Sequence, residues 1–304
     1  KPIGHEISLS WTGYNENDST IASLLNLMTS DSIPESKNKI FDNNTFNLNL
    51  ILADEESIDM IFIGQTPIRP INSQSKGRVI SIGWERTNQW QKNSLSINKK
   101  VPISSSKGVI VNTNNRFFPG DFPNHLSFDW GETQRFVRAT KNISNRQFHT
   151  KESFTEFQND TISETARTLL PLLAKELWYQ RQGEGNIDLN RLKSKSLTLL
   201  SKWNGEMNSH RAEPLIYKTW ITTFQRMVVE DELGLISEDF HQIKPLFLEK
   251  ILRDYENASD WCDIKHSKKK ESCSLLAKES LEESVIFLKN LYGPEISSWR
   301  WGEA

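Results

Sequence analysis

The sequence predicts an α+β protein with a β-rich first half, residues 1–140, and a mostly helical second half, residues 141–304. Three observations predict this class. Apolar residues alternate with period two in the first half, and they recur at helical spacing after residue 151. The length of 304 residues, 36% of them hydrophobic, is enough to bury a sizeable core.

Composition and charge exclude several classes of protein. The 37 Lys and Arg residues nearly balance 39 Asp and Glu, so the formal charge of −2 gives no reason to expect nucleic acid or an anionic membrane as partner. Ten Trp and 15 Phe argue against disorder. No apolar run approaches the roughly 20 residues of a membrane span. The six His residues are scattered without metal-ligand spacing, so we expect no metal site and no cofactor.

The first half contains one clear hairpin signal. Leu48, Leu50 and Leu52 alternate along the chain, a polar stretch follows at residues 53–57, and Ile58, Met60 and Phe62 alternate again. Two such runs with a short polar link predict a β-hairpin. Residues 78–82 and 108–111 are further predicted strands, and the Ser-, Asn- and Lys-rich residues 88–107 predict a surface loop.

The second half contains five predicted helices. The first begins in a capping box formed by Thr161 and Glu164 and is bent at Pro171. The second opens at Asp188 and closes near Gly205. The remaining helices follow at residues 215–233, at residues 237–255 with Ser237 as cap and Pro245 inside, and at residues 274–292 before Gly293.

The ends of the chain and its cysteines give two further expectations. The first residue is Lys1, and the chain stops just after Trp299 and Trp301. Ordinary termini are polar and fray, so we expect a piece cut from a larger protein. Cys262 and Cys273 stand near enough to close a short disulfide loop, and two unrelated buried thiols fit the spacing equally well.

Five motifs in order resemble the penicillin amidase (penicillin acylase) family. No single motif is decisive, and together they extend across nearly the whole chain. They are Ala53-Asp54 with Gly64, Pro67 and Arg69; Gly108 followed by Asn114-Asn115-Arg116; Glu213 to Trp220 with Asp231 to Gly234; Trp261-Cys262 with Cys273; and Trp299-Arg300-Trp301-Gly302.

The resemblance implies an αββα sandwich of the N-terminal nucleophile hydrolases. Members are made as one self-cleaving precursor, which exposes a Ser whose own α-amino group is the base for attack on an amide carbonyl. Because the side chain of Lys1 cannot be that nucleophile, the resemblance implies a nucleophile upstream of this chain. The chain would then be a fragment of the large subunit, inactive by itself, and its partners would be the rest of the precursor and a small acyl-amide substrate.

Site residues can be transferred where the motif is present. Asn114 matches the family Asn that donates its side-chain amide to the oxyanion, a neutral donor that needs no proton transfer. Arg135, in Gly131-Glu-Thr-Gln-Arg135, matches an Arg that orients that Asn or the substrate. Asn115 and Arg116 are candidate substrate-binding residues. The alternatives are purely structural roles: turn hydrogen bonds for the Asn residues and an ion pair with Glu132 for Arg135.

The sequence also departs from the family pattern. The turn after Ala53-Asp54 lacks the usual Gly-Asn and is one residue shorter. Some members bind calcium through an Asp after a Pro, whereas here Asn124 follows Pro123, which puts that ligand in doubt, although calcium remains possible in the full-length protein. These departures leave two other hypotheses open, a non-catalytic binding or interaction module on the same fold and an unrelated α+β domain.

The resemblance also implies a location for the protein and a range of substrates. Family members are exported, so the resemblance implies a periplasmic or secreted protein in which Cys262 and Cys273 form a disulfide. Penicillin, cephalosporin and acyl-homoserine lactone types of substrate all fit a linear-amide acylase.

Overall fold

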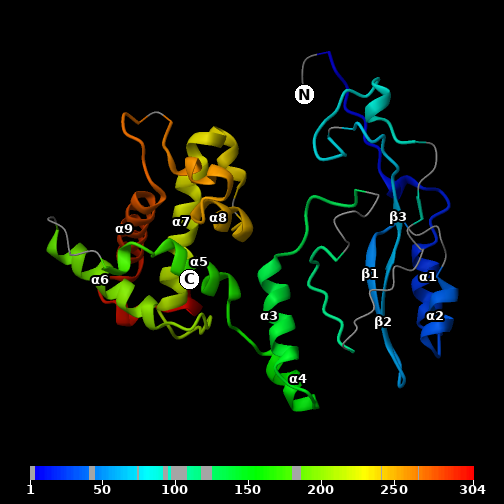
Figure 1. The fold of residues 1–304 in the computed structure, drawn as a ribbon, viewed down its shortest axis with the longest axis horizontal. Coiled ribbons are helices and arrows are strands. Elements are labelled where there is room, and N and C mark those ends of the chain that lie inside the picture. Colours follow the sequence, from blue (N-terminus) through cyan, green and yellow to red (C-terminus); the bar gives the residue numbers. More distant parts are fainter. Residues whose placement is uncertain are drawn as a thin grey trace. The chain divides into compact units, whose positions relative to one another are not determined.

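The computed structural model describes residues 4–40, 45–73, 75–91, 95–96, 108–117, 125–179, 186–240, 242–265 and 267–304. Helices and short antiparallel strands occur together, so the α+β prediction is confirmed. The chain divides into two compact units, Lys1–Gly131 and Glu132–Ala304, and each is described by itself. Figure 1 shows the short strands in the first unit and the long helices in the second. That residues 1–304 form one incomplete domain stays a prediction.

The first unit is organised around a β-hairpin. Strand β1 (Leu48–Ala53) pairs antiparallel with β2 (Ile58–Ile63), with Leu48 opposite Ile63 and Ala53 opposite Ile58. At the turn, the Asp54 carboxylate accepts hydrogen bonds from the backbone N–H groups of Glu56 and Ser57, at 3.0 and 2.8 Å. An Asp that binds the backbone ahead of it stabilises a tight turn. The predicted hairpin is confirmed.

Other elements of the first unit are short. The residue pairs Gln65–Thr66 (β3) and Leu95–Ser96 (β4) form a second small sheet, so the predicted loop over residues 88–107 includes a strand; most of residues 92–107 lies outside the described residues. The described part of the unit also contains helices and 3-10 turns that were not predicted: α1 (Thr20–Leu27), α2 (Ile33–Lys39), η1 (Thr12–Tyr14) and η2 (Arg86–Asn88).

The strands predicted at residues 78–82 and 108–111 are wrong. The N–H of Arg78 closes a turn onto the carbonyl of Ser75 at 2.8 Å, and Lys76 and Gly77 both have positive φ, so the chain turns immediately before the expected strand. Residues 78–82 belong to no strand that the structure describes. Residues 108–111 belong to no strand that the structure describes. Apolar alternation predicts a strand only where a partner strand is available to satisfy the backbone.

The second unit is almost entirely helical, and its helices begin at residue 133 rather than 141. Its α-helices are α3 (Thr133–Ser144), α4 (Lys151–Gln158), α5 (Glu164–Leu173), α6 (Ile187–Lys202), α7 (Glu213–Leu233), α8 (Pro245–Leu252) and α9 (Cys273–Tyr292). Short 3-10 helices lie between and after them: η3 (Leu177–Tyr179), η4 (Gly234–Asp239), η5 (Tyr255–Cys262), η6 (Ile296–Ser298) and η7 (Trp301–Glu303).

The observed helix ends agree with some of the predicted start and stop signals and differ from others. Ser163, not Thr161, caps α5, since its side chain accepts the N–H of Ala166. Helix α7 ends at Gly234 and α9 ends at Gly293, both with positive φ, as predicted. The helix predicted over residues 237–255 is wrong.

The reason lies at Pro245. A proline has no N–H to give a preceding turn, and its fixed φ suits the first helical position, so α8 begins at Pro245 instead of running through it. Ser237 lies in η4, a separate 3-10 helix. Helices α3 and α4 were not predicted.

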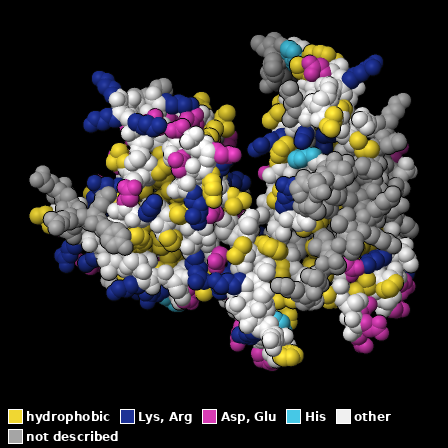
Figure 2. Space-filling view, viewed as in Figure 1, with side chains coloured by type: hydrophobic (Ala, Val, Ile, Leu, Met, Phe, Trp, Pro, Cys, Tyr) yellow, Lys and Arg dark blue, Asp and Glu magenta, His cyan; other side chains and the backbone are white. Residues whose placement is uncertain are grey.

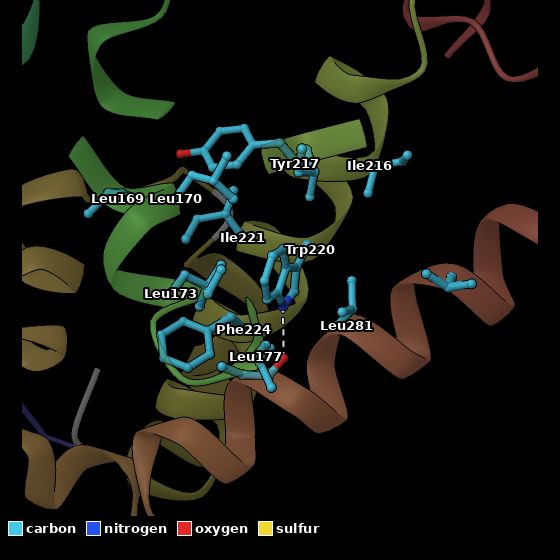
Figure 3. Packing of buried hydrophobic residues seen from close by; sticks show 14 of the residues in the cluster. Leu169, Leu170, Leu173, Leu177, Ile216, Tyr217, Trp220, Ile221, Phe224 and Leu281 are labelled. Carbon is cyan, nitrogen blue, oxygen red and sulfur yellow. Dashed lines mark hydrogen bonds between the residues drawn. The ribbon is translucent and has the colours of Figure 1, made fainter. Parts of the chain in front are cut away.

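The main core lies between α5, α6, α7, α8 and α9. Trp220 and Phe224 of α7 are fully buried, and the Trp220 indole N–H donates to the carbonyl of Ala277 at 2.9 Å and lies 3.1 Å from the Ser280 hydroxyl on α9. Figure 3 shows this bond reaching across to α9 beside Leu281. Trp220 therefore connects α7 to α9 through both apolar packing and a hydrogen bond.

The two cysteines form a disulfide. Cys262 ends η5 and is fully buried, Cys273 begins α9, and their Cα atoms are 5.0 Å apart. The predicted pairing is confirmed. The bond fixes the start of α9 to the segment after α8.

None of the described helices combines the length and the apolar character that a membrane span requires.

Candidate active site

Two loop segments of the first unit lie side by side against β2. Phe117, from residues 108–117, packs on Phe62 of β2 with ring centroids 5.9 Å apart, and on Trp130 at 6.0 Å in an edge-to-face arrangement. Leu126 joins the same small cluster. Aromatic contacts of this geometry hold the segments 108–117 and 125–131 together on one side of the hairpin.

Asn114 lies at the tip of the first segment. Its φ is 62°, a left-handed conformation that Asn tolerates better than most residues, and its backbone N–H donates to Asn112 Oδ1 at 2.9 Å. Its carbonyl oxygen accepts the N–H of Gly131 at 2.5 Å. The side chain is exposed, and its amide makes no hydrogen bond in the part of the chain that the structure describes.

The neighbouring asparagines are used differently. Asn115 Oδ1 accepts the backbone N–H of Thr113 at 3.1 Å and lies 3.3 Å from the Thr113 hydroxyl. Asn112 Oδ1 holds the N–H of Asn114 and is 3.5 Å from the side-chain amide of Asn49 on β1. The turn-forming alternative therefore describes Asn112 and Asn115, whereas the Asn114 side-chain amide has no hydrogen-bond partner among the described residues.

Gly131 is a supporting residue that the sequence analysis did not single out. A Cβ at this position would lie 2.3 Å from the carbonyl oxygen of Thr113 and 3.0 Å from Asn114 Cβ. Only glycine permits this approach, so Gly131 fixes the backbone of Asn114 from the opposite segment. The sequence names Gly131 only as the start of the segment that leads to Arg135, and nothing in that segment indicates contact with Asn114.

Arg116 lies among other basic groups. Its side chain is exposed, and its charge acts on His125 of the second segment. Burial lowers the pKa of the His125 imidazole, and the positive charges of Lys76, Arg69 and Arg116 lower that pKa further. This side of Asn114 is therefore electropositive, and His125 is biased towards its neutral form.

Arg135 belongs to the second unit, in the first turn of α3. Its backbone N–H donates to the carbonyl of Glu132 at 3.2 Å, and its side chain is exposed. Burial raises the pKa of the Glu132 carboxyl, and the charges of Lys244 and Arg135 oppose that rise. Arg135 thus acts electrostatically on Glu132 within its own unit, while Asn114 is placed within the first unit.

The described residues contain no group of three or more His, Cys, Asp or Glu side chains that could bind a metal ion. Pro123 and Asn124, the positions that bear on calcium, lie outside the described residues.

Comparison with known proteins supports the resemblance. The model of the penicillin amidase family matches residues 2–304. The acyl-homoserine lactone acylase QuiP of Pseudomonas syringae pv. syringae (strain B728a) is 22% identical over 317 aligned residues, which cover 99% of this chain and 38% of that protein. The QuiP proteins of P. syringae pv. tomato (strain DC3000) and P. fluorescens (strain Pf0-1) are each 21% identical, over 99% and 94% of this chain.

The chain spans less than two-fifths of the length of these relatives, with 38%, 38% and 36% of them covered. The match to the family model nevertheless includes every motif on which the resemblance was based, from the hairpin to the final tryptophans. The chain belongs to the penicillin amidase family.

Proposed function

We propose that this chain is part of an acylase that hydrolyses a linear amide. The chain supplies the structural framework of the active site, and the attacking Ser belongs to a segment outside it. The observation that carries the proposal is the exposed amide of Asn114, held in a left-handed turn and free of hydrogen bonds within the described residues. Family membership and the names of the relatives, which are acylases, support the reaction class.

In this reaction the carbonyl oxygen of the substrate becomes negatively charged as the nucleophile attacks. The Asn114 amide would donate to that oxygen, and a fixed neutral donor lowers the barrier without a proton transfer. Its geometry is set before substrate arrives, since Asn112 and Gly131 hold its backbone from two sides. Arg135 would orient the substrate or the Asn, and Asn115 and Arg116 would shape the neighbouring surface.

The fold of the complete protein would be an αββα sandwich. Within the described residues β1 and β2 form a sheet of only two strands, which is marginal alone and needs further strands or helices to be stable. Large apolar side chains also remain exposed in the first unit, including Ile71, Val79, Ile80 and Trp84. Figure 2 shows hydrophobic side chains at the surface of both units. Further chain from the same precursor would cover such surfaces.

The disulfide also supports a proposal about location. A disulfide between Cys262 and Cys273 persists in an oxidising compartment, which supports a periplasmic or secreted protein.

The test uses the complete protein from which this chain comes. It should be expressed with its own upstream sequence, and the N-terminus of each processed chain should be identified by mass spectrometry. We expect a chain that begins with Ser, includes the present sequence and cleaves an N-acyl amide. A mature protein with no Ser, Thr or Cys at a processed N-terminus and no amidase activity would instead establish the non-catalytic module.

A further inference from the structure

A group of basic side chains in the first unit, which we call the basic cluster, consists of Arg69, Lys76, Arg78, Arg116 and His125. One part of it is built on Phe128. The imidazole of His125 lies 4.2 Å from the Phe128 ring, and the guanidinium of Arg78 lies over the same ring at 4.9 Å. Two basic groups therefore share one exposed aromatic ring.

A tight turn builds the other part. Lys76 and Gly77 have φ of 48° and 85°, and the N–H of Arg78 donates to Ser75 at 2.8 Å. A Cβ on Gly77 would lie 2.7 Å from Arg69 Nη2, so the guanidinium of Arg69 packs on the backbone of this turn. The same guanidinium lies 5.9 Å from the centre of the Trp90 ring. The turn thus brings Arg69, Lys76 and Arg78 together.

In the described residues no carboxylate forms an ion pair with Arg69, Lys76, Arg78 or Arg116, although in the same unit Lys39 pairs with Glu35 at 2.7 Å and Lys37 pairs with Asp59. Arg69 is half-buried, and burial lowers its pKa. Like charges held close together without an anion repel one another, and binding an anion relieves that repulsion.

The basic cluster adjoins the candidate active site. Arg116 follows Asn114 by two residues, and His125 belongs to the segment that packs on Phe117 and bonds to Asn114 through Gly131. A group recognised here would belong to a molecule whose reacting carbonyl is near Asn114.

We propose that the basic cluster binds a carboxylate carried by the substrate, so that the enzyme prefers amides with a free carboxylate to neutral amides. Guanidinium groups bind carboxylates through paired hydrogen bonds, and the rings of Trp90 and Phe128 offer apolar surface beside the charge. The inference rests on the proposed acylase function. It predicts that an open-chain N-acyl amino acid is a better substrate than the corresponding neutral lactone.

The test compares kcat/KM for N-octanoylhomoserine and N-octanoylhomoserine lactone with the complete processed protein. The two share the acyl chain and the scissile amide, and the first has an open lactone ring, which gives it a free carboxylate and a hydroxyl. A second pair, a glutaric acid monoamide and its methyl ester, places the carboxylate on the acyl half. We expect one of the two charged substrates to exceed its neutral partner by about tenfold, and the difference to shrink in high salt.

Variants assign the effect to the basic cluster. Arg69→Gln and Lys76→Gln should each lower the charged-to-neutral ratio by about fivefold, and Arg69→Lys should retain part of it. Lys39→Gln, which removes a paired cation from the same unit, should leave the ratio unchanged. A ratio near one in both pairs, or a ratio that these variants do not alter, overturns the proposal.

Failure of the acylase proposal can be distinguished from failure of the carboxylate-binding proposal. If the protein cleaves none of the four amides, the acylase proposal fails, and titration calorimetry with N-octanoylhomoserine and with the glutaric acid monoamide still tests the basic cluster. Binding of either compound that weakens in Arg69→Gln and not in Lys39→Gln supports an anion site, and the absence of binding of both rejects it.

Discussion

The N–H of Gly131 donates to the carbonyl oxygen of Asn114 at 2.5 Å and fixes the left-handed turn that exposes the Asn114 amide. Gly131→Ala should therefore displace this turn, because the new Cβ would lie 2.3 Å from the Thr113 carbonyl oxygen. A displacement of the donor by about 1 Å lowers kcat/KM for amide hydrolysis by about a hundredfold.

The matched control is Gly83→Ala, where a Cβ meets no atom within 4 Å and φ is not positive. Steady-state kinetics of the complete protein should show normal activity for this variant. Equal activity in the Gly131 and Gly83 variants would mean that Gly131 does not position Asn114.

The disulfide between Cys262 and Cys273 should stabilise the second unit. It spans 11 positions, and closing a loop of this size restricts the unfolded chain by about 3 kcal/mol. The double variant Cys262→Ser, Cys273→Ser should lose about that much free energy of unfolding in urea. Reductant should destabilise the natural chain and leave the double variant unaffected; a natural chain insensitive to reductant under unfolding conditions would contradict this account.

The ion pair of Arg138 and Asp160 links α3 to the segment before α5, with Arg138 Nε and Nη2 at 2.6 and 2.8 Å from the carboxylate. These hydrogen bonds hold the pKa of Asp160 below its usual 3.8, and Asn142 contributes another. Because the folded-state pKa is lowered, the stabilisation is complete above about pH 5 and is lost as pH falls through the folded value.

Asp160→Asn should accordingly cost about 2 kcal/mol at pH 7 and less near pH 3, measured by urea unfolding at each pH. Asp239→Asn removes an exposed carboxylate without a hydrogen bond in the described residues and should change stability little at either pH. A cost that is the same at both pH values would show that the charge of Asp160 is not what stabilises the link.

Trp220 should be the most sensitive single contact between α7 and α9. Trp220→Phe removes an indole N–H that lies 2.9 Å from the Ala277 carbonyl and leaves a void in a core position with 0% exposure. We expect a loss of about 2–3 kcal/mol in the free energy of unfolding. Trp84→Phe, at a Trp with 75% exposure, should cost almost nothing; equal losses would reject a specific role for Trp220.

Much of the fold was predictable where local signals agree with packing. The β1–β2 hairpin followed from alternation around a polar turn, and the ends of α7 and α9 followed from Gly234 and Gly293. Strands at 78–82 and 108–111 failed because apolar alternation says nothing about whether a partner strand is present. The helix predicted over residues 237–255 failed because a proline such as Pro245 can either break a helix or begin one.

The candidate site was predictable only as residue types. The Asn114-Asn115 motif indicated a polar site, but one sequence does not tell which Asn stabilises the turn and which faces outward. That distinction depends on the φ of 62° at Asn114 and on the approach of Gly131, seventeen positions away in the printed sequence. The basic cluster depends equally on the turn at Lys76 and Gly77, which brings distant residues together.

The most direct test of the central claim is the rate of amide hydrolysis by Asn114→Ala in the complete processed protein, with Asn72→Ala, another exposed asparagine of the first unit, as control. We predict that Asn114→Ala lowers kcat by about 10²–10³-fold with little change in KM or in thermal stability, because the lost hydrogen bond forms only in the transition state. Unchanged kcat in this variant would contradict the account.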